Sequence, residues 1–363
     1  MRFGKIAADA VTAAAVQAAE SRLPPIIYGA KVYLANELQD FVDWGLKLHG
    51  IPELQKATQG EGIKVAILDT GRPDHFDCPP PLFSYNFSRY DSDIDGNGHS
   101  THCAGILAGR ANGKGVLGVA PAAKVGFCKV LGDDGSGDNI GIVRGIDQAI
   151  AEGVDIISMS LGGGYDRTIE SACMRAVKAG IFLICAAGND GEQGNNDTIG
   201  WPARLDDTIA VAAYNEKGFI SGFSSRGDEI DVAFPGEEIL SCWPGNKYRR
   251  LSGTSMATPF AAGVVALMLS YQRKLAANGK MVSPVVTAED LHNRFVQYAK
   301  DQGPKGRDRA WGFGIPDVEG FITGGVTNPP DGDSGSDVVS IGPLRIRFPV
   351  VVAGKSGGFI WVE

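Results

Sequence analysis

A largely apolar, β-branched run, Ile63–Leu68, ends in an acid and a glycine within Asp69-Thr70-Gly71. Such a run is typical of a strand that is buried on both faces of a parallel sheet. Similar runs recur at residues 123–130, 154–159, 181–186 and 209–213, and stretches of helical pattern, including 140–152 and 168–179, lie between several of them. Because strands alternate with helices, we predict an α/β fold with three layers, α/β/α, around a mostly parallel central sheet.

The two ends of the chain lack this alternation. Residues 1 to about 23 have a weakly amphipathic helical pattern, and extended pieces follow between Ile26 and Leu34. Near the other end, Thr287-Ala288-Glu289-Asp290 opens a predicted helix that reaches Ala299. We therefore predict four parts: an N-terminal extension (1–38), a main domain (39–325), a polar linker (326–337) and a C-terminal β-rich tail (338–363).

Composition argues against several classes of protein. The net charge is −8 and no Lys/Arg-rich run is present, so we expect no nucleic-acid partner. The apolar stretch near the N-terminus is interrupted by polar residues, unlike a signal peptide, and no segment approaches the roughly 18 apolar residues of a membrane span. The six cysteines lack C-x-x-C spacing, which indicates reduced core residues and neither a disulfide framework nor a zinc site. These features predict a cytoplasmic protein with no membrane partner.

Ser255 lies in Gly253-Thr254-Ser255-Met256-Ala257-Thr258-Pro259, immediately before the apolar run Phe260–Leu269. This order places the serine at the N-terminus of a predicted helix, where backbone N–H groups and the helix dipole favour negative charge. The position suits a nucleophile whose attack creates an oxyanion. It equally suits a simple N-cap, and the local sequence alone favours the cap.

Two other glycine-rich segments carry groups that could act with Ser255. They are Asp69-Thr70-Gly71 and Gly98–Gly105, which contains His99 and His102. A serine hydroxyl is a weak nucleophile until an imidazole accepts its proton, and the imidazole needs a carboxylate to orient it. The alternatives are a turn residue at Asp69, a capping His99, or a metal held by both histidines, for which no third Cys or His stands at ligand spacing.

Four motifs in this order resemble the subtilisin-type serine proteases, or subtilases, and in particular the intracellular subtilisins of bacteria. The four motifs are Val65–Gly71, His99–Gly105, Ala186–Gly191 and Gly253–Pro259. The resemblance covers about Phe41 to Thr323. It implies a subtilisin-like fold and a serine endopeptidase of broad specificity, without a catalytic metal. By the same resemblance Ser255 is the nucleophile, His99 the general base and then acid, and Asp69 its orienting carboxylate. Ser100 stands where the family has glycine.

The resemblance also implies how a polypeptide substrate is bound. Asn189 matches the asparagine whose amide binds the oxyanion, a contact that lowers the barrier by roughly 3 kcal/mol. Substrate would pair as an added strand with two edges, Gly135-Ser136-Gly137 and Ser160-Leu161-Gly162-Gly163. Asp190, near the base of the first specificity pocket, would help to accept a basic or polar side chain. Asp95 matches an acid near the catalytic histidine.

A structural calcium ion is implied as well. The loop Arg110–Val116 resembles the family's tight calcium site, in which Asn112 offers its side chain and Arg110, Lys114 and Val116 offer carbonyl oxygens. Asp77, with Asp40 or Gln39, would complete an oxygen-rich shell suited to a hard cation.

The N-terminal extension is expected to be a pro-segment that inhibits its own enzyme. Intracellular subtilisins carry short segments with a proline–aromatic motif, and Pro25-Ile26-Ile27-Tyr28 is loosely similar to that motif.

Three rival functions remain to be weighed. Asp69-Thr70-Gly71 and Asp333-Ser334-Gly335 both have the form used by aspartic proteases, but Asp333 lies in a polar linker, whereas a dyad needs two buried acids. A degenerate subtilase could serve as a binding module, yet here no member of the triad is missing. A transpeptidase on the same scaffold would ligate or cyclise peptides.

Overall fold

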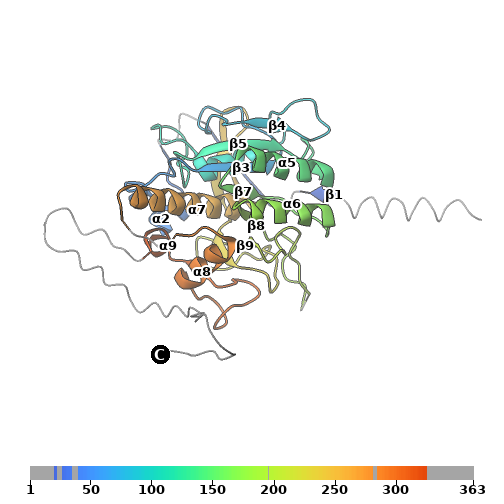
Figure 1. Cartoon of the computed structure of the whole chain (residues 1–363). Helices are drawn as coiled ribbons and strands as arrows, with labels where there is room; N and C mark the ends of the chain where they lie inside the picture. The colour runs from blue at the N-terminus through green and yellow to red at the C-terminus, as the bar shows by residue number, and fades with distance from the viewer. Residues whose placement is uncertain (1–19, 23–26, 35–39, 195, 281–283, 325–363) are drawn as a thin grey trace, which may run out of the picture. The chain divides into compact units, whose positions relative to one another are not determined.

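A parallel sheet of seven strands forms the centre of the protein in the computed structural model, which describes residues 20–22, 27–34, 40–194, 196–280 and 284–324 (Figure 1). Its strands lie in the order β10-β9-β8-β7-β3-β5-β4. Their bounds are β3 (Lys64–Asp69), β4 (Ser84–Asn86), β5 (Lys124–Lys129), β7 (Ile156–Met159), β8 (Phe182–Ala186), β9 (Thr208–Tyr214) and β10 (Val232–Pro235). The predicted parallel sheet is therefore confirmed.

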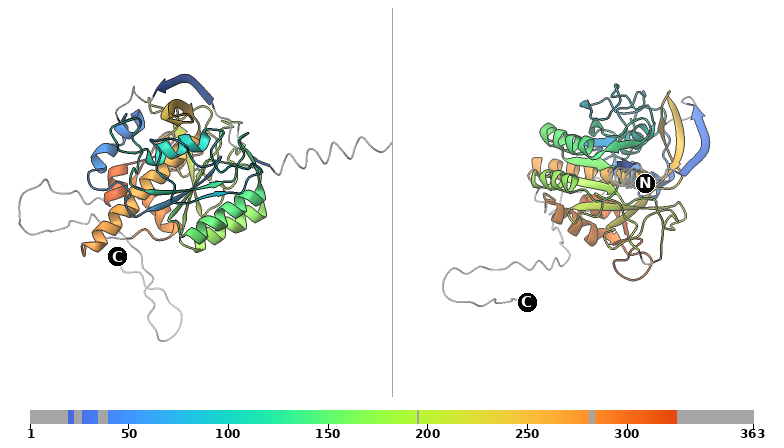
Figure 2. Two further views of the ribbon diagram at one scale, coloured as in Figure 1. Left: turned by 90° about the horizontal axis from the view of Figure 1, so that it is seen from above. Right: turned by 90° about the vertical axis from the view of Figure 1, so that its right-hand side faces the viewer.

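Helices cover both faces of this sheet (Figure 2). One face carries α4 (His99–Ala108) and α7 (Thr254–Ala277), and the other carries α5 (Asn139–Glu152) and α6 (Arg167–Lys178). Alternate side chains of β3 enter the two cores: Val65 and Ile67 pack on the α4–α7 side, and Ala66 and Leu68 pack on the α5–α6 side. This double burial explains why the strand has almost no polar residues, and it confirms the three-layer α/β/α prediction.

Helix α7 is the longest of the described helices and is almost wholly enclosed. Its first 19 residues, Thr254 to Gln272, are buried on every side, which matches an apolar sequence with no polar face. By length and composition this helix could cross a membrane, although the sequence-based prediction found no segment that approached a membrane span. In the folded domain its most apolar window is completely buried, as in the core helix of an α/β protein.

Smaller elements surround the three layers. The helices among them are α2 (Trp44–Leu48), α3 (Ile51–Leu54), α8 (Ala288–Tyr298) and α9 (Val318–Thr323). The strands β13 (Ala299–Lys300) and β14 (Ile315–Pro316) form an antiparallel pair. The capping box predicted for α8 is present: the Thr287 hydroxyl accepts from the Asp290 N–H, and the Asp290 carboxylate accepts from the Thr287 N–H.

Two strands of the N-terminal extension pair with the main domain. Strand β1 (Glu20–Arg22) lies antiparallel to β6 (Ser136–Asp138). Strand β2 (Ile27–Leu34) lies antiparallel to β12 (Lys247–Ser252), which forms a hairpin with β11 (Ile239–Trp243) and is visible beside β2 in Figure 2. The helix predicted to about residue 23 is therefore wrong at 20–22, because pairing with β6 gives these residues extended backbone. Residues 1–19 lie outside the described ones.

All six cysteines are buried and none forms a disulfide, as expected for residues of the core. The chain divides by its contacts into one unit that ends at Gly325 and another that begins at Val326. The predicted linker and β-rich tail belong to the second unit, and all their residues lie outside the described part of the chain, as does Asp333.

Candidate active site

The carboxyl ends of three parallel strands supply the site. Asp69 is the last residue of β3, Ser160 directly follows β7, and Asn189 lies three residues beyond β8. Open α/β sheets place their ligands at this edge, because the strands end there and loops begin. Ser255 reaches the same place from the opposite direction, as the second residue of α7.

Asp69 and His99 form a buried pair at the centre of this edge. The Nδ1 atom of His99 lies 2.8 Å from Asp69 Oδ1 and 2.9 Å from Oδ2, and His99 is fully buried. Among the described residues, no hydrogen-bond partner lies near His99 Nε2. Because a carboxylate accepts, Nδ1 carries a proton, and in the neutral ring Nε2 is then the nitrogen with a free lone pair.

Ser255 lies next to this pair. The Cys103 thiol lies 3.9 Å from His99 Nδ1 and donates to the Ser255 carbonyl oxygen at 3.4 Å, so it contacts both residues. The Ser255 hydroxyl is directed to Ser160 O at 3.4 Å, a long and weak contact. The Ser160 hydroxyl in turn donates to the Ser255 carbonyl at 2.9 Å.

Two opposing effects act on the pKa of His99, namely its burial and the neighbouring Asp69 carboxylate. Burial favours the neutral ring and by itself lowers the pKa of His99. The adjacent Asp69 carboxylate outweighs that effect and, with a smaller contribution from Cys103, raises the pKa of His99 well above its ordinary value. The pair therefore holds imidazolium strongly.

Asn189 is oriented by the residue that precedes Ser255. Its Oδ1 accepts from the Thr254 backbone N–H at 2.9 Å and from the Thr254 hydroxyl at 3.0 Å. This arrangement turns Nδ2 toward Gly253, where a side-chain Cβ would lie only 3.1 Å from it. A side chain at position 253 would therefore press on the Asn189 amide, whereas the backbone there, with φ 163°, is ordinary extended backbone.

The predicted substrate edges contain glycines for specific reasons. Gly135 has φ 76°, a left-handed conformation that favours glycine, and a Cβ at Gly137 would meet Val130 O at 2.4 Å. On the second edge, Leu161 is buried and Gly163 exchanges both backbone hydrogen bonds with Trp201 at 3.0 Å. Gly163 is therefore not open to an added strand, which corrects its assignment as a substrate position. Backbone alternation directs Gly162 to the other side. Asp190 is exposed.

Asp95 connects the two elements that carry the Asp69–His99 pair. Its Oδ1 accepts from the Thr70 hydroxyl at 2.8 Å, just after β3, and from the Gly98 N–H at 2.8 Å. Its Oδ2 accepts from the N–H and the hydroxyl of Thr101 in the first turn of α4. The buried carboxylate thus fixes the start of α4 against the end of β3.

Lys129 reinforces the same junction, and the sequence-based prediction missed it. It is the register partner of Asp69 on the neighbouring strand, and its fully buried ammonium group donates to Thr70 O, Ile94 O and Asp133 Oδ1. A lysine that closes an otherwise apolar strand was the available signal, because a buried cation needs compensating oxygens.

His102 does not join His99 in a metal site. Its Nε2 lies 2.9 Å from Arg249 O and 3.1 Å from Ile239 O, and burial lowers the pKa of His102 to about 3. His99 instead forms a cluster with Asp69 and Cys103, in which the ligand atoms lie within 4.8 Å of one another. The two histidines therefore face different neighbours.

The predicted calcium residues also converge. Asp77 accepts from Asn112 Nδ2 at 2.9 Å and from the Val116 N–H at 2.8 Å, and the Arg110 N–H donates to its carbonyl. The Asp40 carboxylate accepts from the N–H groups of Asn112, Gly113 and Lys114. Asp40 thus accepts from the backbone N–H groups of the loop, whereas Asn112 turns its amide nitrogen to Asp77 and its Oδ1 to the Lys114 N–H.

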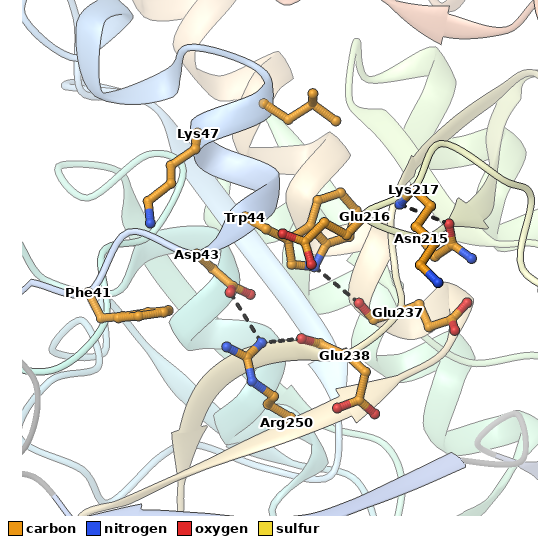
Figure 3. A pocket seen from close by; sticks show the side chains of 11 residues that line it. Phe41, Asp43, Trp44, Lys47, Asn215, Glu216, Lys217, Glu237, Glu238 and Arg250 are labelled. Atoms are coloured by element: carbon orange, nitrogen blue, oxygen red, sulfur yellow. Dashed lines mark hydrogen bonds and ion pairs between the residues drawn. The ribbon is translucent and has the colours of Figure 1, made fainter.

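A separate pocket of about 900 Å³ lies where α2 meets the β11–β12 hairpin (Figure 3). Asp43 pairs with Arg250 at 3.2 Å there, and Trp44 Nε1 donates to Glu237 O at 3.2 Å. None of the predicted catalytic or substrate residues lines it. These contacts attach the beginning of the domain to the hairpin.

Comparison with known proteins identifies the family of the chain. Residues 60–314, which contain every predicted catalytic residue, match the Subtilase family. The chain belongs to the subtilase family. It is 40% identical over 273 residues to a protein named major intracellular serine protease from Bacillus subtilis (strain 168), which covers 71% of this chain and 84% of that protein.

Two further relatives support the same conclusion. An intracellular serine protease from Paenibacillus polymyxa is 44% identical over 62% of this chain and 72% of its own length. Subtilisin E from Bacillus subtilis (strain 168) is 40% identical over 68% of this chain and 66% of its own length. As a member of this family, the chain is a subtilisin-type serine protease, which confirms the resemblance described above.

Ser100, the departure from the family's motif, is expected to lower the stability of the fold. It does not adopt positive φ, so the backbone accepts serine, but its buried hydroxyl has no hydrogen-bond partner among the described residues. An unsatisfied buried donor costs about 1–3 kcal/mol. We therefore expect Ser100→Ala to raise the free energy of unfolding by about 1–2 kcal/mol, measured by thermal or denaturant unfolding.

Ser241→Ala is the matched control, because that buried hydroxyl donates to His102 O at 2.7 Å. Its removal should lower stability. A loss of stability in both variants would show that the Ser100 hydroxyl is satisfied.

Proposed function

We propose that the chain hydrolyses peptide bonds with Ser255 as nucleophile, His99 as general base and then acid, and Asp69 as the carboxylate that orients His99. The buried Asp69–His99 pair is the observation that supports this most directly, since it leaves His99 Nε2 as the nitrogen for proton transfer. The Ser255 hydroxyl now donates weakly to Ser160 O, and rotation about its Cα–Cβ bond would release it for attack.

Each step of this reaction uses one of these groups. Ser255 Oγ attacks the carbonyl carbon while its proton passes to His99, and His99 returns that proton to the leaving amine as the C–N bond breaks. Water then repeats the sequence on the acyl-enzyme. Asn189 Nδ2 and the Ser255 N–H would stabilise the oxyanion, and the Thr254 contacts that fix Asn189 support this role.

The chain's own N-terminal segment is proposed as an inhibitor of this site. Strand β1 pairs Ser21 with Gly137 and Arg22 with Ser136, which occupies the edge assigned to substrate. Strand β2 pairs Ile27 with Ser252, three residues before the nucleophile. A segment tethered in this way competes with substrate as if it were present at about millimolar concentration. We propose that the chain is made as a zymogen.

We also propose a cytoplasmic location and a structural calcium ion. Six free cysteines suit a reducing compartment, and two of the relatives are named as intracellular proteases. The oxygen donors of Asp77 and Asn112, with carbonyls of Arg110, Lys114 and Val116, fit a hard cation in their chemistry. Calcium would supply stability to the loop at 110–116 and no chemical step.

The pH profile tests the assigned base. Since the pKa of His99 is raised above its ordinary value of 6.5, His99 is protonated and inactive as a base below that raised pKa. We therefore expect kcat/KM to increase with pH through an inflection above 6.5. In Asp69→Asn the inflection should move to lower pH, because the carboxylate no longer offsets the effect of burial, which lowers the pKa of His99. The same change should lower kcat by about 10⁴-fold.

Ser255→Ala is the control for this experiment and should have no activity above contaminant level. A profile whose inflection is unchanged in Asp69→Asn would contradict the assignment of His99 as the base.

Deletion of residues 1–38 tests the inhibitor. The shortened chain should cleave a peptide substrate faster from the start of the assay, and the full-length chain should show a lag. A milder variant is Ser21→Pro, which removes a backbone N–H at the centre of β1 and should shorten the lag. Equal initial rates for the full-length and shortened chains would contradict the proposal.

Calcium is tested by unfolding. Removal of calcium with a chelator should lower the melting temperature of the chain, and Asp77→Asn should lower it while abolishing the response to calcium. Asp74→Asn, at an exposed carboxylate three residues away, is the matched control and should respond as the parent does. A parent protein that melts at the same temperature with and without calcium would contradict the site.

A further inference from the structure

A second cluster of metal-ligating side chains lies apart from the triad. A ring nitrogen of His75 and the sulfurs of Cys78 and Cys242 all lie within 4.8 Å of one another. His75 and Cys78 belong to the segment after β3, whereas Cys242 lies on β11, more than 160 residues away in the sequence. The spacing in the sequence gave no sign of this cluster, because folding brings the third ligand to it.

The three side chains are enclosed and held in place. Cys242 is fully buried, and His75 and Cys78 are 8% and 4% exposed. Cys78 Sγ donates to Thr101 O at 3.7 Å, and His75 Nε2 lies 3.0 Å from Lys247 O. The donors are therefore brought together before any ion binds, which lowers the entropic cost of forming a site.

The hydrogen bonds of His75 fix its tautomer. A carbonyl oxygen can only accept, so Nε2 carries the proton and donates to Lys247 O. Metal-ligating histidines commonly donate one ring N–H to a backbone carbonyl while the other nitrogen binds the ion. The other nitrogen here, Nδ1, accepts from the Asp77 N–H at 3.1 Å, and that is the bond a cation would replace.

The chemistry of the donors selects the kind of ion. Two thiolates and one imidazole suit zinc and similar thiophilic cations, whereas calcium prefers oxygen ligands. A structural zinc site has four ligands, and this cluster supplies three of them from protein side chains. Near-complete burial favours a closed, structural site over a catalytic one, which keeps an open position.

We propose that His75, Cys78 and Cys242 form a structural site for a thiophilic divalent cation of the zinc class. Its place in the fold gives it a role. Cys78 contacts α4 at Thr101, and Ser241, beside Cys242, donates to His102 O in the same helix. A bound ion would join the segment after β3 to β11 and so hold α4, whose first residue is His99.

Cobalt(II) is the probe that tests this site, because thiolate ligands give it intense charge-transfer absorption. The full-length chain with Ser255→Ala, which prevents self-digestion, is reduced, supplied with excess calcium and titrated with cobalt. We expect one equivalent to bind with thiolate charge transfer, and zinc to displace it. Loss of an outer-shell partner already weakens metal binding about 10–100-fold, so Cys78→Ala and Cys242→Ala should each weaken it by at least about 100-fold.

Cys103→Ala is the matched control, since Cys103 belongs to the separate cluster with Asp69 and His99. It should keep the absorption. Circular dichroism and the melting temperature show whether each variant is folded, and His75→Gln provides a third ligand change if one cysteine variant fails to fold. Zinc should raise the melting temperature of the parent and leave that of Cys78→Ala unchanged.

Three results would overturn the proposal. The first is the absence of charge-transfer absorption in the reduced parent. The second is its loss in Cys103→Ala with retention in the Cys78 and Cys242 variants, which would place the ion at the triad. The third is a disulfide between Cys78 and Cys242, found by peptide mapping, that persists in the chain under the reducing conditions of the titration.

Discussion

The contact between Asp69 and His99 depends on the junction between one strand end and one helix start. Neither residue could hold its position alone: Asp69 ends β3, His99 begins α4, and Asp95 bonds to both sides of the gap between them. Lys129, on the neighbouring strand, reinforces the same junction, because its ammonium group donates to two carbonyl oxygens and a carboxylate. A buried carboxylate and a buried ammonium group are each tolerable only because their hydrogen bonds are satisfied. The geometry on which the chemistry depends is therefore a property of the polar network beneath it.

The sequence predicted the central sheet and its helices because their apolar patterns reflect burial directly. Val65 to Leu68 alternate between two cores, so every position is apolar, and the same is true along α7. The hairpin β11–β12 was not predicted. Its strand KYRRLS mixes charged and apolar residues, and its pairing with β2 joins segments more than 200 residues apart, which no local pattern encodes. The strand at 20–22 was missed for the same reason, because its partner β6 lies more than 100 residues away.

In the candidate site, too, the sequence predicted some features and not others. Asp69, His99, Asn189 and Ser255 could be assigned because each lies in a short motif whose residue types carry the chemistry. The supporting contacts of Thr254 with Asn189, and of Cys103 with His99 and Ser255, are set by approach between elements and have no local signature. Gly163 illustrates the limit most clearly. It has the expected sequence, yet Trp201 already uses its backbone hydrogen bonds.

Helix α7 carries Ser255 in its first turn and then runs through the centre of the molecule. Nineteen successive buried residues connect Ser255 rigidly to the main core, so the serine has no hinge of its own. Local opening, which in many enzymes releases an active-site segment well below the energy of global unfolding, has little to act on here. Ser255 and the core therefore form one cooperative unit, and heat or denaturant that displaces Ser255 must unfold the domain with it.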